Sequence, residues 1–168
     1  MKNVFLNNRF FFALFGVGIC YVLAFFFPIL MGVAHGFLIV VFLAIFVAYL
    51  LLFREKNAVQ AQRILPEKLS NGDQNSIKVD LKNNYPFQIK TVTIDEIPFQ
   101  FQKRDFFIER SIEAKKNVLF EYVLEPKERG EYSFGNLNIF AQTSLGFVSR
   151  RFTFQKDELV PSFPSFIH

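Results

Sequence analysis

The sequence contains no tryptophan, one cysteine and two histidines among its 168 residues. The single Cys20 has no partner for an intrachain disulfide and no nearby metal ligands, so a disulfide framework and a cysteine metal site are both excluded. His35 and His168 supply no Ser–His–acid set, and the chain has no Gly-rich phosphate loop and no dinucleotide-binding fingerprint. We therefore predict a non-enzymatic protein with no catalytic, cofactor-binding or metal-binding residue.

Charge is also absent from one long segment. Phe10–Phe53 holds 44 residues without an Asp, Glu, Lys or Arg. A bilayer core takes about 20 helical residues to cross, so this segment is about twice one span. Backbone groups in hydrocarbon must be hydrogen-bonded internally, which requires helices.

A proline and two glycines interrupt this segment at Pro28, Gly32 and Gly36. An unbroken 44-residue helix would be about 66 Å long, which no bilayer accommodates. We predict two transmembrane α-helices, about Phe10–Phe27 and Phe37–Phe53, joined by a tight turn.

Other interpretations of this region are less favoured. A buried helical hairpin in a soluble protein would need more covering surface than the remaining polar residues provide. A cleaved signal peptide would end in a small-x-small site, whereas the first apolar run ends in Phe25-Phe26-Phe27-Pro28. The Gly32-x-x-x-Gly36 pattern resembles a helix-packing motif, but its position predicts a hairpin loop instead. His35 is interpreted as a turn residue near the head groups.

Basic residues flank the apolar segment on both sides. Lys2 and Arg9 precede it and Arg54 and Lys56 follow it, whereas the turn is uncharged. Because short basic flanks stay in the cytoplasm, we predict a membrane protein with both termini cytoplasmic. The remaining chain carries 17 basic and 15 acidic residues, a balance too even for a nucleic-acid binder.

After the apolar segment the hydrophobic period changes from helical to strand-like. In Ser76–Lys82, Ile77, Val79 and Leu81 alternate with Lys78, Asp80 and Lys82. Further segments of this kind are Phe87–Ile94, with a phase slip near Lys90-Thr91 that suggests a bulge, Ile97–Phe101, Phe106–Ile112, Val118–Leu124, Glu131–Phe140 and Phe147–Phe154. Short strands separated by turns predict an all-β antiparallel sandwich of immunoglobulin-like architecture.

These patterns divide the chain into four parts. We predict a two-helix transmembrane anchor at 1–53, a juxtamembrane linker at 54–63, a β-sandwich at 64–156 and a further linker at 157–168.

Three sets of residues are candidates for binding: the acidic pair Asp95-Glu96, the basic residues Lys127, Arg129, Arg150 and Arg151, and the pair Phe106-Phe107 beside Arg104-Asp105. Asp95-Glu96 is favoured as a solvated loop over a metal site. The basic residues are favoured as a solvated strand face over a patch for lipid head groups or an acidic partner. Phe106-Phe107 is favoured as core over an exposed docking pair.

Gly130 and Tyr132 follow a Pro-Lys-Glu-Arg turn and open a strand. This position favours a positive φ at Gly130 and a tyrosine corner at Tyr132, in which the hydroxyl bonds back to the preceding chain. The alternative is that Arg129 and Tyr132 form a binding pair at a loop tip.

Several motifs of the second half are familiar as a set: Asn83-Asn84-Tyr85-Pro86-Phe87, the run Arg129-Gly130-Glu131-Tyr132-Ser133-Phe134-Gly135, and Ser144-Leu145-Gly146-Phe147. In this order, after a two-helix hairpin, they resemble the amino-terminal part of bacterial "domain of unknown function 58" membrane proteins. Phe163-Pro164-Ser165-Phe166 resembles the link that leads in that family to a von Willebrand A-like domain, which is missing here.

The resemblance implies a scaffold or accessory protein of the bacterial inner membrane, a fragment of a protein that works beside a MoxR-type AAA+ ATPase. We predict that ATPase, or other subunits of a membrane complex, and the lipid bilayer as partners. The resemblance implies no residue-level site. The alternative function is an outward-facing ligand-binding or adhesive sandwich, which would need the opposite topology, and a membrane enzyme with an unrecognised site is a further alternative.

Overall fold

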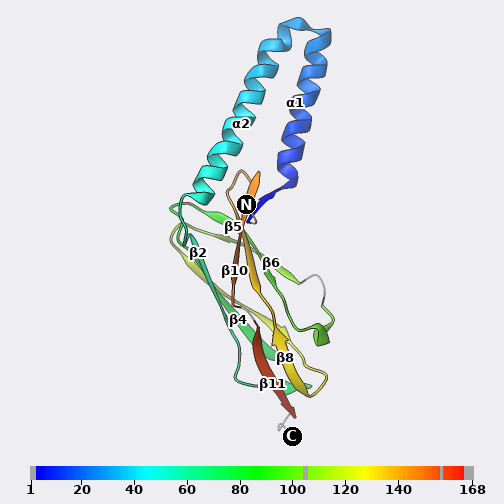
Figure 1. Cartoon of the computed structure of the whole chain (residues 1–168), viewed down its shortest axis with the longest axis vertical. Coiled ribbons are helices and arrows are strands. Elements are labelled where there is room, and N and C mark those ends of the chain that lie inside the picture. The colour runs from blue at the N-terminus through cyan, green and yellow to red at the C-terminus, as the bar shows by residue number, and fades with distance from the viewer. Residues whose placement is uncertain (1–2, 104–105, 156, 165–168) are drawn as a thin grey trace. The chain divides into compact units, whose positions relative to one another are not determined.

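The computed structural model describes residues 3–103, 106–155 and 157–164. The chain forms two compact units (Figure 1). The first comprises Met1–Lys56 and Ala141–Arg151, and the second comprises Asn57–Phe140 and Phe152–His168. Each unit is described by itself.

The first unit is built around two helices. Helix α1 spans Asn8–Phe26 and helix α2 spans Met31–Phe53, and a 3₁₀ turn, η1, at Pro28–Leu30 joins them. The helices lie side by side and antiparallel (Figure 1). Both are long and apolar enough to cross a membrane, and only 11% and 17% of their most apolar windows are buried inside the protein.

The buried residues of the two helices are small or β-branched, apart from Leu52 at the end of α2. Val17 and Ala24 are the buried residues of α1 and stand seven positions apart, and Ala34, Val41 and Ala48 repeat the same interval on α2. A seven-residue interval keeps one seam facing the partner helix, and small side chains let the two backbones approach closely. This packing leaves the larger apolar side chains on the outside of the hairpin.

The predicted turn between the helices was too long. Helix α2 begins at Met31 and not at Phe37, so the glycines and His35 belong to its first turns. A glycine in a helix costs about 1 kcal/mol. In an apolar environment, however, the backbone N–H and C=O groups must be hydrogen-bonded to one another, which favours the helix at Gly32 and Gly36. Pro28 is therefore the residue that sets the position of the turn. A Cβ atom at Gly32 or Gly36 would meet nothing within 4 Å, so this pair is not a packing motif. His35 Nδ1 lies 2.7 Å from the Met31 carbonyl oxygen.

The first unit also contains a strand that the sequence did not predict. Strand β1, Val4–Leu6, pairs antiparallel with the beginning of β10, Val148–Phe154, with Val4 opposite Arg150. The basic amino-terminal segment is therefore a short strand as far as it is described, and Lys2 lies outside the described residues.

The second unit is an all-β sandwich, as predicted. Its further strands are β2 (Val59–Ile64), β3 (Leu69–Asn71), β4 (Asn75–Asn83), β5 (Ile89–Asp95), β6 (Phe107–Ile112), β7 (Asn117–Leu124), β8 (Gly130–Phe134), β9 (Leu137–Gln142) and β11 (Glu158–Pro164). They form sheets in the orders β2-β4-β7, β3-β11-β8 and β10-β9-β5-β6, and β9 and β10 continue into the first unit. The pairs β2-β4, β4-β7, β5-β6 and β8-β11 are antiparallel, whereas β11 and β3 are parallel.

The alternation predicted for β4 is confirmed. Ile77, Val79 and Leu81 are fully buried, whereas Lys78 is exposed and Asp80 is half-buried. The neighbouring strand β7 buries Phe120, Tyr122 and Leu124. In both strands one apolar face supplies the core, because successive side chains point to opposite sides of a sheet.

Strand β5 keeps the predicted phase at Ile89, but the predicted slip near Lys90-Thr91 is absent, so the phase of its second half is opposite to the prediction. Its inward residues are Ile89, Thr91, Thr93 and Asp95, and its register against β6 is continuous, without a bulge. The apolar Ile94 faces outward instead. The buried threonine at 91 donates a hydrogen bond to the Arg110 carbonyl oxygen at 3.1 Å, which lowers the cost of its burial.

Both predicted linkers contain strands. Strand β2 lies within 54–63 apart from its last residue and pairs with β4 over six residues, burying Arg63 rather than Ile64. Strand β11 lies within 157–168; its first part pairs with β8 and its last part with β3, so Ser162 alone is paired on both sides. The two prolines of this strand, Pro161 and Pro164, each have a neighbour on one side, where a missing N–H is tolerated.

Two other strand predictions were wrong. Ile97–Phe101 forms no strand: Phe99–Phe101 is a 3₁₀ turn, η2, and Phe99 is 85% exposed. The segment Glu131–Phe140 is divided between β8 and β9 by a turn at Gly135-Asn136. In both segments the local backbone conformation decides the secondary structure, although the apolar residues alternate as in a strand.

Candidate functional site

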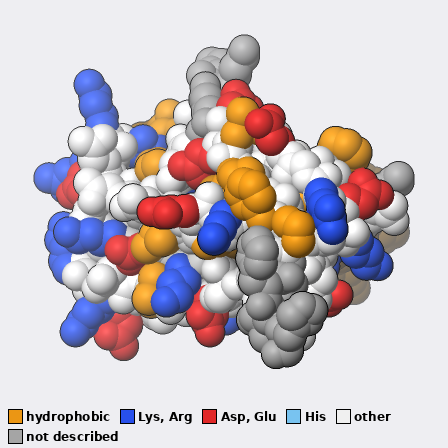
Figure 2. Space-filling model, turned by 90° about the horizontal axis from the view of Figure 1, so that it is seen from below, with side chains coloured by type: hydrophobic (Ala, Val, Ile, Leu, Met, Phe, Trp, Pro, Cys, Tyr) orange, Lys and Arg blue, Asp and Glu red, His pale blue; other side chains and the backbone are white. Residues whose placement is uncertain are grey.

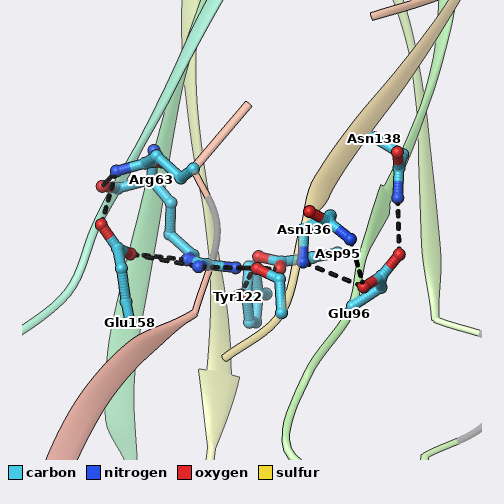
Figure 3. A network of polar contacts seen from close by, with 9 residues as sticks. Arg63, Asp95, Glu96, Tyr122, Asn136, Asn138 and Glu158 are labelled. Carbon is cyan, nitrogen blue, oxygen red and sulfur yellow. Dashed lines mark hydrogen bonds and ion pairs between the residues drawn. The ribbon is translucent and has the colours of Figure 1, made fainter. Parts of the chain in front are cut away.

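The second unit contains a cluster of charged and polar side chains in its interior (Figure 3). Arg63 of β2 lies at its centre, with Asp95 of β5, Tyr122 of β7 and Glu158 of β11 around it. Fixed charges are seldom buried unless they are paired, so this cluster is the first candidate for a functional site.

Every nitrogen of the Arg63 guanidinium group has a partner. Nη1 donates to Asp95 Oδ1 at 2.5 Å, and Nε and Nη2 donate to Glu158 Oε2 at 3.2 and 3.1 Å. Nη2 also donates to the Gly135 carbonyl oxygen at 3.1 Å, and the guanidinium lies 5.1 Å from the centre of the Phe134 ring. These hydrogen bonds use four of the five N–H groups of the guanidinium, so Arg63 joins β2 to β5, to β11 and to the segment that follows β8.

The side chain of Gln155 extends the cluster to the backbone of β2. Its amide oxygen accepts from the Arg63 N–H, and its amide nitrogen donates to the Arg63 carbonyl oxygen at 3.0 Å and to Glu158 Oε1 at 2.9 Å. One side chain thus pairs with both backbone groups of an edge residue, as a neighbouring strand would.

Burial and hydrogen bonding act in opposite directions on Asp95. Burial raises the pKa of its carboxyl group because it disfavours the charged form, and Arg63 and the Tyr122 hydroxyl partly offset this by stabilising the carboxylate. The Tyr122 hydroxyl donates to Asp95 Oδ2 at 2.5 Å. Its pKa is raised by burial and by the adjacent carboxylate, which would repel a phenolate.

The raised pKa of Tyr122 predicts a loss of stability at alkaline pH. The unfolded chain releases this proton near pH 10, whereas the folded chain keeps it. Stability from this group is therefore complete below about pH 10 and falls by up to about 1.4 kcal/mol per pH unit above it. The test is urea unfolding of wild type and Tyr122→Phe in an uncharged detergent, at several pH values from 8 to 11. Unfolding is followed by the circular dichroism signal of the β-strands. A wild-type slope no steeper than that of Tyr122→Phe would contradict the assignment.

The two residues of the predicted acidic turn have different roles. Asp95 belongs to the buried cluster, so the interpretation of it as solvated was wrong. Glu96 is exposed; its Oε2 accepts from the Asn136 backbone N–H at 2.9 Å, and its Oε1 accepts from Asn138 Nδ2 at 2.8 Å (Figure 3). A Cβ atom at Gly135 would lie 2.7 Å from Glu96 Oε2, so this turn needs glycine. Among the described residues, no group of three or more His, Cys, Asp or Glu could hold a metal ion.

The predicted basic set is divided between the two units. Arg150 and Arg151 belong to the first unit, whereas Lys127 and Arg129 are exposed in the second. Figure 2 shows a face on which Lys and Arg side chains are interspersed with Asp, Glu and small hydrophobic groups. Among the described side chains of that face, charge of one sign does not extend over a broad area.

The aromatic pair is also divided. Phe106 is half-buried, and its ring centre lies 4.6 Å from that of Tyr122, as the core interpretation predicts. Phe107 is exposed. Arg104 and Asp105 lie outside the described residues, as does His168.

The predicted tyrosine corner is present. Tyr132 is buried, and its hydroxyl donates to the Glu128 carbonyl oxygen at 2.9 Å. Gly130 has a φ of +137°, which side chains with a Cβ rarely adopt. A small polar hollow of about 130 Å³ lies beside the tyrosine. Together with Phe134 and Gly135, these residues give the Arg-Gly-x-Tyr-x-Phe-Gly run a structural role.

Substitutions at this corner should lower stability. Gly130→Val should cost about 1–3 kcal/mol, because it forces a β-branched residue into a strained backbone conformation. Tyr132→Phe should cost about 1 kcal/mol, the value of one hydrogen bond. Thermal unfolding of the full chain in detergent measures both. If both variants kept full stability but lost co-purification with an ATPase partner, the corner would be a binding site instead.

The polar cluster was not predicted from the sequence. Its members come from four strands, two of which lie in segments interpreted as linkers, and Arg63 and Asp95 each stand where an apolar residue would be expected. A possible signal was the alternation Val59, Ala61, Arg63, which places the arginine on the apolar face.

Comparison with known proteins gives similarity of structure only. No family model and no curated protein matches the chain. The ASH/PapD-like domain 7 of human CEP192 is similar with a TM-score of 0.46 and 12% identity, covering 64% of this chain and 87% of that domain. The C-terminal domain of wzt has a TM-score of 0.43 and 10% identity, over 66% and 77% of the two chains. The CARDB domain of PF1109 from Pyrococcus furiosus has a TM-score of 0.41 and 13% identity, over 62% and 87%.

Proposed function

We propose that the chain is a membrane-anchored, non-enzymatic scaffold or accessory protein, in which a helical hairpin holds a β-sandwich at the bacterial inner membrane. The observation that carries the proposal is the outer surface of the hairpin. Phe12, Phe25 and Ile29 are 73%, 80% and 89% exposed, and most other large apolar side chains of both helices are exposed as well. Such a surface is stable in lipid and aggregates in water.

The closed polar cluster supports a scaffold rather than an enzyme. Asp95 and Tyr122 have the perturbed pKa values typical of active sites, but both are buried and hydrogen-bonded to each other. Their arrangement holds strands together and presents no reactive atom to a substrate.

Topology decides between this function and the outward-facing adhesive alternative. Arg9, Arg54 and Lys56 flank the helices, and η1 carries no charge, so both termini should be cytoplasmic. An alkaline phosphatase fused after His168 should be inactive, and green fluorescent protein at the same position should fluoresce. Alkaline phosphatase fused after Leu30 should be active. The reverse pattern would overturn the cytoplasmic scaffold and favour the adhesive sandwich.

We propose a MoxR-type AAA+ ATPase as the partner class. The motifs of the second half support this, through their resemblance to "domain of unknown function 58" proteins. Tagged chain should retain such an ATPase after mild detergent extraction. Recovery of lipid alone, with the ATPase present in the same cells, would argue against that partner.

A further inference from the structure

From the polar end of the helical hairpin, we infer a site for the headgroups of anionic phospholipids. This inference rests on the proposed membrane anchor. Its residues, called the basic collar here, are Arg9, Arg54, Lys56, Arg150 and Arg151, all in the first unit. The described part of that unit contains five Lys or Arg side chains and one carboxylate, that of Glu55.

Arg150 holds the end of α2 in place. Its Nη1 donates to the carbonyl oxygens of Leu52 at 2.7 Å and Glu55 at 2.6 Å, and its guanidinium lies 4.9 Å from the centre of the Phe53 ring. Carbonyl groups at a helix C-terminus lack helical partners and carry partial negative charge, so a cation there is stabilising. Arg150 therefore fixes the segment that carries Arg54 and Lys56.

Arg9, in the first turn of α1, holds the loop that contains Ser144 and Leu145. Its Nη1 donates to the carbonyl oxygens of Ser144 at 3.4 Å and Leu145 at 3.3 Å. Asn7 supports the same loop, since its Nδ2 donates to the Gly146 carbonyl oxygen at 3.0 Å and its Oδ1 accepts from the Ser149 hydroxyl at 2.5 Å. The loop is thus fixed to the end of the helix by several hydrogen bonds.

Exposed apolar side chains lie among these cations. Leu145 of the loop is 46% exposed, and Phe5 and Leu6 of β1 are also exposed. The Arg151 guanidinium lies 5.7 Å from the centre of the Phe5 ring. Cations beside apolar groups at the end of a membrane helix fit the phosphate and upper acyl chain of a lipid. Free phosphate would use the cations alone, so the apolar groups favour a lipid.

Arg54 and Lys56 are the cations to remove in a test. Both side chains are exposed, and neither forms an ion pair or a side-chain hydrogen bond with a described residue. The double variant Arg54→Gln/Lys56→Gln should therefore fold as the wild type does. Lys127→Gln/Arg129→Gln is a matched control, because it removes two exposed cations from the second unit.

The experiment measures lipid selectivity of the full chain in phosphatidylcholine bilayers. Electron spin resonance gives the relative association of spin-labelled phosphatidylglycerol and phosphatidylcholine with each variant. Wild type should prefer phosphatidylglycerol at low ionic strength, by up to about fivefold for each participating cation. The preference should fall in Arg54→Gln/Lys56→Gln, persist in the control, and weaken near 1 M salt, where the Debye length is about 3 Å.

The outcomes separate the two proposals. Equal association of both lipids with inserted wild type would overturn the lipid site and leave the anchor intact. An equal loss in both double variants would also overturn it, because general charge would then explain the preference. Extraction of the chain from membranes by alkaline carbonate would overturn the anchor itself, and the lipid site with it.

A second measurement tests whether the loop that contains Leu145 lies at the lipid surface. The chain has no tryptophan, so Leu145→Trp introduces a single tryptophan, whose emission can be excited selectively over that of the tyrosines. Its emission should be quenched by lipids brominated near the head group. Phe42→Trp, in the middle of α2, is the control and should be quenched by lipids brominated deeper in the acyl chain. Quenching of the control without quenching at position 145 would exclude the loop from the lipid surface.

Discussion

Replacement of Arg63 by alanine should destabilise the β-sandwich by about 3–5 kcal/mol. The substitution leaves the Asp95 carboxyl group buried without its cation and removes the partner of Glu158 and of the Gly135 carbonyl oxygen. Because burial already raises the pKa of Asp95, loss of Arg63 should raise it further, and the carboxyl should take up a proton in the folded state. The variant should therefore be relatively less destabilised at acidic pH than at neutral pH.

Urea unfolding of the full chain in neutral detergent at pH 5 and pH 8 measures both effects. Arg129→Ala is the matched control, since this arginine is exposed, and its loss should change stability by no more than about 0.5 kcal/mol. If Arg63→Ala were as mild as the control, the buried cluster would not be holding the strands together. Asp95→Asn should be intermediate, because an amide keeps a hydrogen-bonding group at the position.

The second large effect is expected in the apolar core. Leu81 is fully buried on β4, between Ala61 of β2 and Val118 of β7, and Leu81→Ala should cost about 2–5 kcal/mol. Lys78 lies on the other face of the same strand, and Lys78→Ala should stay within about 0.5 kcal/mol. Both residues lie on the same strand, so the difference between the two changes in unfolding free energy reports which face of the sheet each side chain occupies. Equal destabilisation in urea would show that the register of β4 is wrong.

The sequence was sufficient wherever one physical effect dominated. In the helices, the absence of charge over a long segment left only a helical hairpin. In β4 and β7, strict alternation of apolar and polar residues identified the buried face, and the structure confirms Val79, Leu81, Phe120 and Tyr122 as buried. Gly130 and Tyr132 were also predictable, because a turn before a strand constrains both residues locally.

The failures arose where polar residues are buried. Asp95 and Arg63 enter the interior only because each is the partner of the other, and they stand 32 positions apart. Neither residue indicates a core position when its own strand is considered alone, so the second half of β5 was predicted out of phase and β2 was predicted as a linker. Strand β11 was missed because 157–168 was interpreted as a linker, through the resemblance of 163–166 to an inter-domain link. Only the arrangement of β8 and β3 on either side explains how the prolines of this strand fit.

The order in which the chain emerges during synthesis gives the polar cluster a further consequence. Arg63 meets Glu158 across 95 positions and Gln155 across 92, whereas its contact with Asp95 spans 32. Closing a longer loop costs more conformational entropy, and residues 155 and 158 leave the ribosome after the strands that carry Arg63, Asp95 and Tyr122. Strands β2, β4, β5 and β7 can therefore assemble early, when Asp95 is the only carboxylate paired with the Arg63 guanidinium. Strand β11 then brings the Glu158 carboxylate to Nε and Nη2, so a strand made after these four closes the polar cluster.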